Sequence, residues 1–439
     1  MQIDLERIID RSRLGPLQWR VLILCGLVTL LDGYDLQAMA SATPALAADW
    51  NVTPASLRWV ITAALIGIAV SALLLSPLGD YLGRRTMLIG SFAVVAIAML
   101  MTAQAQDATD LIWWRFVTGL GLGASVPNAF AITAEYVPQP RRAAIVALMA
   151  SGLALGAALC GFVAPYLLDL GGWRMMFTFG GVVMALLCLP LFALPESLRF
   201  LVARGRDPRR IGRLVEQLDR SFRHATENRY LIAEHESQGR LSVAQLFSDG
   251  RSRATVLLWI VFFINLGLLH LLASWLPTLL KLRELSMGQS LRGAAMFQLG
   301  GIGGALLLAV AMRQWSPFRV LVVSYLATVG ALLLLAGGTA PVPLLFALVL
   351  VIGSGIVGGQ AALNALAATM YPTTARSTGV GWALGIGRLG AILAPLFGAA
   401  LLAVGFSAAE VFATAIVPTL LCAGVVALLG RDALSRQRS

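Results

Sequence analysis

The sequence predicts an all-α polytopic membrane protein whose twelve transmembrane helices form two parallel six-helix repeats. Hydrophobic residues make up 58% of the 439 residues and charged residues only 13%, whereas a soluble domain carries about 25% charged residues. The apolar residues gather into a dozen runs of about 20 residues, the length that crosses about 30 Å of hydrocarbon. The second half of the chain also repeats landmarks of the first half.

The spans follow from the apolar runs, and the longest polar stretch separates the first six from the last six. This organisation predicts an N-terminal six-helix bundle at 1–194, a cytoplasmic central loop at 195–253 and a C-terminal six-helix bundle at 254–439. The loop contains a short amphipathic helical segment rich in Arg and Glu, and we expect its basic face to lie on the inner membrane surface. The predicted spans are 20–42, 57–78, 86–104, 111–133, 143–167, 173–194, 254–280, 292–312, 318–338, 343–369, 378–403 and 407–430.

The two halves match when the chain is shifted by 234 residues. Matched positions at predicted cytoplasmic turns carry the same residue without gaps: Arg85 and Arg319, Pro138 and Pro372, Arg142 and Arg376. Parallel six-helix repeats around a site at the bilayer midplane are a secondary-transporter architecture. The repeat therefore predicts a protein that moves a small solute by alternating access.

The formal net charge of +11 orients the chain in the membrane. With both termini in the cytoplasm, 26 of the 33 Lys and Arg residues fall on the cytoplasmic side, six, including Arg115, fall on the other side, and Arg388 falls within a span. This distribution follows the positive-inside rule. The basic excess therefore orients the protein, and we expect no binding to nucleic acid. We also expect a multi-pass protein of the cell inner membrane, in contact with the lipid bilayer, that functions as a monomer.

Several kinds of site are missing from the sequence. The single lysine, Lys281, lies between two leucines, so the chain lacks the Gly-Lys-Ser/Thr of a phosphate-binding loop. No cluster of His, Cys and Asp is present, and the four cysteines have spacings that suit neither zinc nor disulfides: Cys25, Cys160, Cys188 and Cys422. The sequence therefore predicts no enzyme, no metal and no cofactor. If the protein works uphill, an ion gradient or a partner must then drive it.

Two acids, Asp32 and Asp35, lie deep within the first span. Ionisable groups cost at least about 2.5–3.5 kcal/mol each inside a bilayer, so such groups have a function by default. Three residues apart on a helix, both carboxylates can face one cavity. A buried pair of carboxylates can take up and release a proton near neutral pH, which predicts proton coupling. The alternative is that they pair with Arg388 or another Arg and hold helices together.

Arg388 lies about ten residues into the eleventh span. Its guanidinium is permanently charged and matches a carboxylate with two hydrogen bonds. It is predicted to clamp an anionic substrate, or alternatively to act as the counter-ion of Asp32 or Asp35. His270, within the seventh span, could relay protons or contact substrate, or pack as a neutral side chain.

Other polar and aromatic side chains within the spans are candidate substrate-binding residues. Gln360 and Asn364 present two amides on one face of the tenth span, and Asn128 lies within the fourth. Such amides can hydrogen-bond a substrate or bridge helices. The aromatic side chains can stack on an aromatic substrate or simply pack: Tyr34, Trp275 and Phe297.

A run between the second and third spans, Gly79-Asp80-Tyr81-Leu82-Gly83-Arg84-Arg85, resembles the signature loop of the major facilitator superfamily. Three further segments match that superfamily: Arg115-x-x-x-Gly119, Glu135 and Pro195-Glu196-Ser197. The resemblance covers essentially the whole chain and implies the major facilitator fold. It also implies gating roles for Asp80, Arg84, Arg85, Arg115, Glu135 and Arg376.

Asp32-Gly33-Tyr34-Asp35 is similar to the first-span motif of the aromatic acid:proton symporter family. The same family is resembled by Tyr371-Pro372-x-x-x-Arg376 and by Gly381-Trp382-Ala383-x-Gly385-x-Gly387-Arg388. The resemblance implies uptake of an aromatic carboxylate, such as a hydroxybenzoate, benzoate or hydroxyphenylpropionate, together with a proton. It implies that uptake depends on Asp32, Asp35, Asp80, Arg376 and Arg388.

The second-half copy of the signature loop, residues 312–319, departs from the pattern because it carries no acid. Gating by matched acids in both halves is therefore not expected. Two alternatives to an aromatic-acid importer stay open within transport, a symporter of a non-aromatic organic acid and an exporter. Outside transport, the alternatives are a membrane receptor and a lipid-modifying enzyme, and the latter would need a convergent nucleophile or metal set that the sequence lacks.

Overall fold

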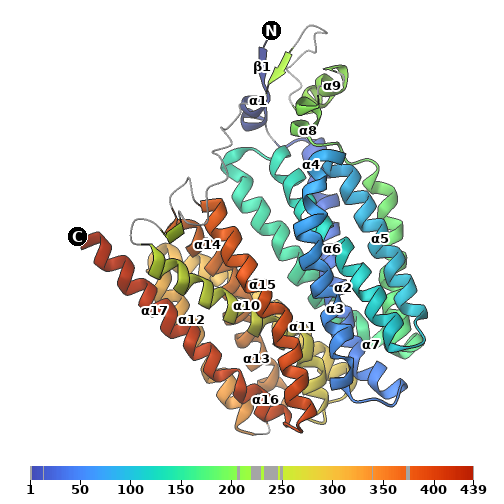
Figure 1. Ribbon diagram of the computed structural model, residues 1–439, viewed down its shortest axis with the longest axis vertical. Coiled ribbons are helices and arrows are strands. Elements are labelled where there is room, and N and C mark those ends of the chain that lie inside the picture. The colour runs from blue at the N-terminus through green and yellow to red at the C-terminus, as the bar shows by residue number, and fades with distance from the viewer. Residues whose placement is uncertain are drawn as a thin grey trace. The chain divides into compact units, whose positions relative to one another are not determined.

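The computed structural model describes residues 2–12, 14–204, 208–218, 229–231, 246–247, 251–338, 340–371 and 376–438. Within these residues the chain is helical apart from its turns and one short strand pairing (Figure 1). β1 (Gln2–Asp4) and β2 (Arg229–Leu231) pair in parallel, outside the membrane spans. The all-α prediction is therefore confirmed for the membrane-spanning part.

The helices of the first part of the chain agree with the predicted spans. The short helices and turns around them are α1 (Leu5–Arg11), η1 (Pro54–Leu57), η2 (Ser76–Leu78), α4 (Gly79–Leu82), α8 (Leu198–Ala203) and α9 (Pro208–Leu218). The long helices are α2 (Pro16–Asp49), α3 (Arg58–Leu74), α5 (Arg84–Gln104), α6 (Ala108–Tyr136) and α7 (Gln139–Leu191).

The second part of the chain is built in the same way. Its helices are α10 (Ser252–Lys281), α11 (Met287–Gln314), α12 (Pro317–Ala336), α13 (Val342–Gly353), α14 (Gly359–Met370), α15 (Arg376–Ala403), α16 (Ala408–Thr414) and α17 (Ile416–Arg438). A π-helical turn, η4 (Ser354–Gly358), joins α13 to α14.

Eleven helices among the described residues are long and apolar enough to cross a membrane. One of them, α7, has 53 residues and would be roughly 80 Å long if continuous, far more than a bilayer core of about 30 Å. It is interrupted at Gly171 and Gly172, and Gly172 has φ 64° and ψ −163°, a conformation open essentially only to glycine. The break divides α7 into two spans, so the prediction of twelve spans is confirmed.

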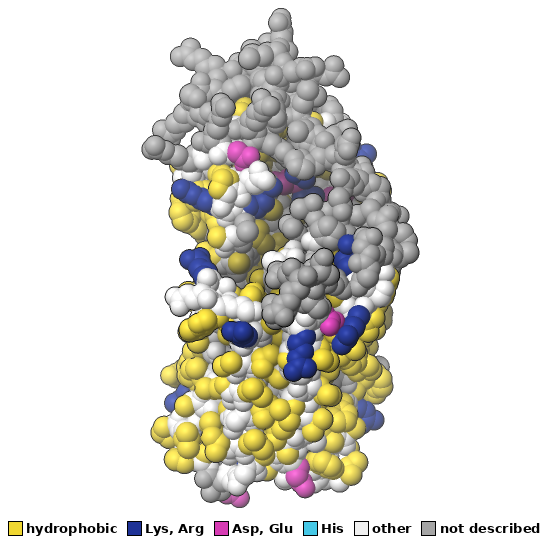
Figure 2. Space-filling model, turned by 90° about the vertical axis from the view of Figure 1, so that its left-hand side faces the viewer, with side chains coloured by type: hydrophobic (Ala, Val, Ile, Leu, Met, Phe, Trp, Pro, Cys, Tyr) yellow, Lys and Arg dark blue, Asp and Glu magenta, His cyan; other side chains and the backbone are white. Residues whose placement is uncertain are grey.

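The surface of the spans is apolar, as a lipid-facing surface must be. Leu73 and Leu148, which lie within the spans, are 76% and 71% exposed. On the face drawn in Figure 2, hydrophobic side chains cover broad continuous areas. Soluble monomers rarely expose apolar patches of this extent, so these areas indicate contact with lipid.

The described chain divides into two compact units. The first unit contains Met1–Asp35, Ala63–Gly156 and Arg174–Ser237, and the second contains Leu36–Thr62, Ala157–Trp173 and Gln238–Ser439. The boundaries between these units pass through α2, α3 and α7. The predicted division into residues 1–194, 195–253 and 254–439 stays a prediction.

The central segment contains the amphipathic helix that the sequence predicts. In α9 the buried side chains are Ile211, Val215 and Leu218, while Arg213 is exposed. The spacing of four and three residues is that of one face of a helix.

Close backbone crossings hold the first unit together. A Cβ on Gly33 would lie 1.9 Å from the carbonyl oxygen of Leu153, and one on Gly156 would lie 1.7 Å from that of Leu30. α2 and α7 therefore touch backbone to backbone, as small residues allow in membrane helices. The Gly within Asp32-Gly33-Tyr34-Asp35 thus has a packing role that is separate from the acids.

Gly33→Ala should destabilise the protein because its methyl group has to separate two backbones. Gly26→Ala is the matched control on the same helix, since its Cβ would meet only the Met149 sulfur, at 3.8 Å. We expect Gly33→Ala to lower the apparent melting temperature in detergent by several degrees or to prevent folding. Gly26→Ala should equal wild type or exceed it, because Ala is the better helix former. Equal melting temperatures would contradict the crossing.

Candidate functional site

Asp35 and Arg115 form a buried ion pair in the first unit. Arg115 Nη1 and Nη2 donate to Asp35 Oδ1 and Oδ2 at 2.7 and 2.9 Å, and the two side chains are 0% and 1% exposed. The Arg115 guanidinium also lies over the Phe177 ring, 5.8 Å from its centroid. A two-point contact of this kind is among the strongest polar contacts a protein makes.

Asp32 has a different environment from Asp35. It is fully buried, and its Oδ2 accepts a hydrogen bond of 2.8 Å from the Ser125 hydroxyl. Its Oδ1 is buried without a hydrogen-bond partner among the described residues. Asp32 therefore has a neutral neighbour on one oxygen and none on the other.

The order of these contacts shows how α2 and α6 run. Asp35 meets Arg115 early in α6, whereas Asp32, nearer the start of α2, meets Ser125 ten residues further along α6. The two helices are therefore antiparallel, with their polar side chains on facing surfaces. Tyr34, between the acids, is buried, and its hydroxyl donates to the Met176 carbonyl at 2.9 Å.

The structure gives Arg115 a partner that the charge distribution did not indicate. The charge distribution predicts that Arg115 lies on the outer side of the membrane, and the structure shows its side chain buried in the protein and paired with Asp35. The predicted alternative that the acids pair with an Arg and hold helices together is confirmed for Asp35, and the partner is Arg115. The motif Arg115-x-x-x-Gly119 carried no indication of this pairing, because the partner lies 80 residues away.

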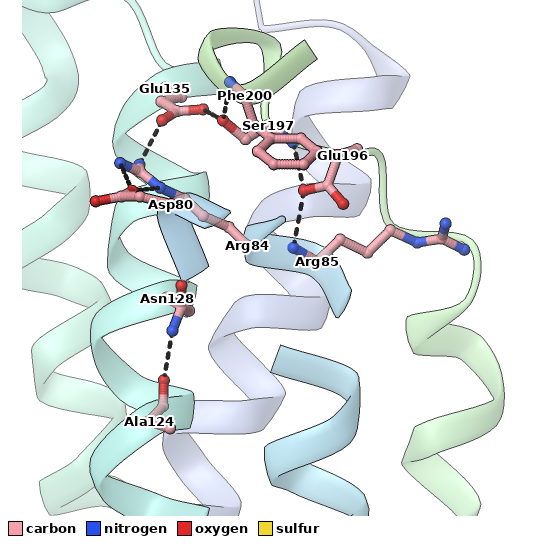
Figure 3. A network of polar contacts seen from close by, with 9 residues as sticks. All are labelled: Asp80, Arg84, Arg85, Ala124, Asn128, Glu135, Glu196, Ser197 and Phe200. Carbon is pink, nitrogen blue, oxygen red and sulfur yellow. Dashed lines mark hydrogen bonds and ion pairs between the residues drawn. The ribbon is translucent and has the colours of Figure 1, made fainter. Parts of the chain in front are cut away.

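A second polar network lies where α4, α5, α6 and α8 meet (Figure 3). Arg84 pairs with the buried Glu135 and, at 3.2 Å, with Asp80, whose side chain is 69% exposed. Glu135 Oε2 accepts from the Ser197 hydroxyl at 2.5 Å, and Ser197 in turn caps α8 by accepting from the Phe200 amide at 3.0 Å. The network therefore ties the signature loop to the ends of α6 and α8.

Glu196 stabilises the start of α5. Its Oε1 accepts from the backbone amides of Arg85 and Ser197 at 3.0 and 2.9 Å. A carboxylate at a helix N-terminus complements the helix dipole. Gly83, with φ 98°, leaves room for this carboxylate, since a Cβ there would lie 2.6 Å from it. The segment 195–197 thus caps two helices, α5 through Glu196 and α8 through Ser197. The sequence indicated only that this segment matches the superfamily.

Asn128 lies beside the signature loop, residues 79–85. Its Nδ2 donates to the carbonyl of Ala124 in its own helix (Figure 3), and its Oδ1 lies against Gly79. Both amide atoms of Asn128 therefore contact the protein itself. Its contact with substrate stays a prediction.

The second unit contains a chain of uncharged polar groups. Tyr325 Oη donates to Asn265 Oδ1 at 2.9 Å, Asn265 Nδ2 donates to Gln360 Oε1 at 2.9 Å, and Gln360 Nε2 donates to Asn364 Oδ1 at 3.1 Å. Gln360 and Asn364 therefore share one face of their helix, as their spacing predicts, and Gln360 also bridges to α10 through Asn265. Asn265 and Tyr325 were missed, although a polar Asn within the seventh span was a signal that could have identified the first of them.

The aromatic candidates of the second unit are packed. Trp275 is fully buried and donates to the Pro395 carbonyl at 2.9 Å, and Phe297 is also buried. His270 Nδ1 lies 2.9 Å from the Leu266 carbonyl. A carbonyl only accepts, so Nδ1 carries the hydrogen in this contact.

Arg388 lies within α15 and is exposed. No ion pair of Arg388 occurs among the described residues, and the counter-ion alternative is wrong for Asp35, which pairs with Arg115. Arg376 is the first residue of α15, and its side chain lies outside the described residues.

Asp35→Asn and Asp32→Asn should differ in stability although both remove one buried carboxylate. Asp35→Asn leaves the Arg115 charge buried without a partner, which costs about 3–5 kcal/mol. Asp32→Asn leaves no cation behind and can keep the Ser125 hydrogen bond, so we expect a change within about 1 kcal/mol. The thermal stability of both variants can be measured by the reaction of the buried cysteines with a thiol-reactive dye during heating. Asp35→Asn combined with Arg115→Gln should recover stability, and equal losses in the single variants would contradict the assignment.

Glu135→Gln should destabilise the protein more than Asp80→Asn. Both acids pair with Arg84, but Glu135 is buried and Asp80 is exposed. Loss of the buried partner should cost about 1–3 kcal/mol, whereas an exposed pair contributes about 0–1 kcal/mol. The same melting measurement checks this order, and a larger loss for Asp80→Asn would reverse our reading of the network.

Comparison with known proteins identifies the family. Residues 25–357 match the model of the Major Facilitator Superfamily. The chain is 37% identical over 430 residues to the 4-hydroxybenzoate transporter PcaK of Pseudomonas aeruginosa, covering 98% of this chain and 96% of that protein. It is 35% identical to the gallate transporter of Pseudomonas putida, with 92% and 90% covered. It is 32% identical to the 3-(3-hydroxy-phenyl)propionate transporter of Escherichia coli, with 94% of each covered.

Solved structures share the fold. The inward open xylose transporter XylE from E. coli superposes with a TM-score of 0.72 at 15% identity, covering 94% of this chain and 95% of that one. A bacterial homolog of the human lysosomal transporter Spinster gives a TM-score of 0.70 at 15% identity, with 95% and 97% covered. The chain therefore belongs to the major facilitator superfamily, and it is a multi-pass membrane transporter rather than an enzyme.

Proposed function

We propose that this protein imports an aromatic carboxylic acid together with a proton, by alternating access. The observation that carries the proposal is the similarity, over nearly the whole chain, to relatives named as transporters of 4-hydroxybenzoate, gallate and 3-(3-hydroxy-phenyl)propionate. Two features support it, a buried acid that can carry a proton and a cation within a candidate span, Arg388, that has no ion pair among the described residues.

Asp32 is the acid that we assign to the proton. A proton on Asp35 would break the ion pair with Arg115, whereas a proton on Asp32 breaks none. Asp32 Oδ1 has no hydrogen-bond partner among the described residues, so it can take up the proton while Oδ2 keeps its hydrogen bond from the Ser125 hydroxyl. In this proposal Asp35 and Arg115 form the fixed frame beside the site, and Asp32 changes its protonation during transport.

Arg388 is the residue that we assign to the substrate carboxylate. The residue is exposed and has no ion pair among the described residues, and the planar fork of an Arg binds a carboxylate through two hydrogen bonds. The network of Asp80, Arg84 and Glu135 would open and close during gating. The charge distribution supports an inner-membrane protein with cytoplasmic termini. We further propose that it acts as a monomer and that its halves 1–194 and 254–439 move against each other during transport.

Proteoliposomes test the function directly. With an imposed pH gradient, acid outside, labelled 4-hydroxybenzoate should accumulate inside, and collapse of the gradient by a protonophore should release it. Accumulation that is insensitive to the gradient would exclude proton coupling. Uptake of a non-aromatic acid such as succinate, with no uptake of 4-hydroxybenzoate or benzoate, would favour the alternative of an organic-acid symporter.

Asp32→Asn should separate coupling from translocation. The variant lacks the proton site but keeps the Asp35–Arg115 frame, so it should lose accumulation driven by the pH gradient. Exchange of external labelled substrate for internal unlabelled substrate, which needs no net proton movement, should persist within about threefold of wild type. Unchanged accumulation would move the proton site elsewhere, with His270 as the next candidate.

A further inference from the structure

The polar chain of the second unit joins three helices through buried groups. Tyr325 of α12 and Asn265 of α10 are both 0% exposed, and Gln360 of α14 is 8% exposed. Every bond in the chain lies between 2.9 and 3.1 Å. The chain ends at Asn364, which is only half-buried.

One carbonyl fixes the direction of every hydrogen bond in this chain. Asn265 Nδ2 also lies 3.2 Å from the backbone oxygen of Ile356, within the π-helical turn Ser354–Gly358. A backbone carbonyl can only accept, so the nitrogen of Asn265 must point to it. Asn265 Oδ1 therefore accepts from Tyr325, and Gln360 Oε1 accepts from Asn265.

The directions of these hydrogen bonds also determine which atom of Asn364 is left unbonded at the end of the chain. Gln360, having used its oxygen, presents Nε2 to Asn364 Oδ1, so the amide nitrogen of Asn364 is left over. This nitrogen has no hydrogen-bond partner among the described residues, and it is absent from the buried unpartnered atoms. Hence the chain ends in an accessible N–H donor, not in an acceptor.

An unpaired amide within a membrane helix has a role by default, because polar groups there face the protein interior or a water-filled space. The π-helical turn Ser354–Gly358, which leads into the helix of Asn364, is a feature often found at functional sites. We propose that the Asn364 amide donates a hydrogen bond to an oxygen substituent on the ring of the substrate. This inference rests on the proposed function and names the feature that selects hydroxylated rings.

The ring substituent fits this donor better than the carboxylate does. A carboxylate is best matched by a charged, two-point donor, and Arg388 in the same unit supplies one. A neutral N–H is the appropriate partner for a phenolic oxygen, which accepts through its lone pairs. A site built to hydrogen-bond a hydroxyl discriminates against the analogue that lacks it, because its own polar group is then left unpaired.

Tyr325 and Asn265 act as positioning residues in this arrangement. Tyr325 lies three bonds away along the chain and holds Asn265 in place through Oδ1. Asn265 in turn holds Gln360, and Gln360 orients Asn364. Loss of the Tyr325 hydroxyl should therefore weaken the selection of hydroxylated rings, although Tyr325 itself touches no substrate in this proposal.

The test compares two probes, 4-hydroxybenzoate and benzoate, by the half-saturation concentration for uptake into proteoliposomes. Wild type should favour 4-hydroxybenzoate. In Asn364→Leu the preference should fall about tenfold, the effect of losing one such hydrogen bond, while the half-saturation concentration for benzoate stays unchanged. Tyr325→Phe should reduce the preference in the same direction, by about threefold.

Tyr371→Phe is the matched control. It also removes one hydroxyl from a buried tyrosine of the same unit, but that hydroxyl bonds to Thr255 at 3.3 Å, outside the chain. Its ratio between the two probes should equal that of wild type.

The outcomes separate the two proposals. If Asn364→Leu and Tyr325→Phe weaken both probes equally, or leave the ratio unchanged, the chain only bridges helices and the inference is overturned. Equal half-saturation concentrations for the two probes in wild type would also overturn it, with aromatic-acid import intact. If Asn364→Leu does not fold, Tyr325→Phe decides alone, because its ring still fills the site. Uptake of neither probe by wild type would instead reject the proposed function.

Discussion

The packing of α2 against α6 in the first unit depends on the buried pair of Asp35 and Arg115. Each charge alone would be costly in an apolar interior, and the two together are tolerable only in good geometry with both guanidinium nitrogens engaged. That requirement sets the register of α2 against α6. Once the register is set, Asp32 necessarily meets α6 at Ser125, and the glycines on the other side of α2 meet α7.

The consequence is that two neighbouring acids of the same motif have unequal chemistry. Asp35 is compensated by a permanent cation, so its charge belongs to the frame of the protein. Asp32 has a hydroxyl on one oxygen and nothing on the other, so its charge has no compensation among the described residues. An arrangement in which one acid holds the structure allows the other to change its protonation without loosening the helices.

Polar contacts at the end of this unit have a different character. Glu135 and Ser197 are buried, whereas Asp80 is exposed, so the network around Arg84 combines one strong contact with one weak contact. The buried chain of the second unit, from Tyr325 to Asn364, contains no charged group. Its neutral hydrogen bonds orient the side chains, whereas the first unit relies on an ion pair. In the proposed mechanism the first unit therefore handles the proton, and the second unit discriminates between rings.

The sequence by itself determined the membrane spans, the break between the fifth and sixth of them, and the presence of two deep acids, because hydrophobicity and span length are local properties of the chain. It also determined that Gln360 and Asn364 share a helix face, since their spacing is a matter of helical period alone. Only the tertiary structure decided that Asp35 pairs with Arg115 and not with Arg388, that Asp32 keeps a free oxygen, and that Tyr34 and Trp275 have their polar atoms bonded to backbone carbonyls. Tertiary structure also added Asn265, which meets Gln360 from 95 residues away. These contacts depend on the register between helices that are distant in sequence. Close packing and the cost of unpaired buried polar groups set that register, and a local sequence pattern contains information on neither.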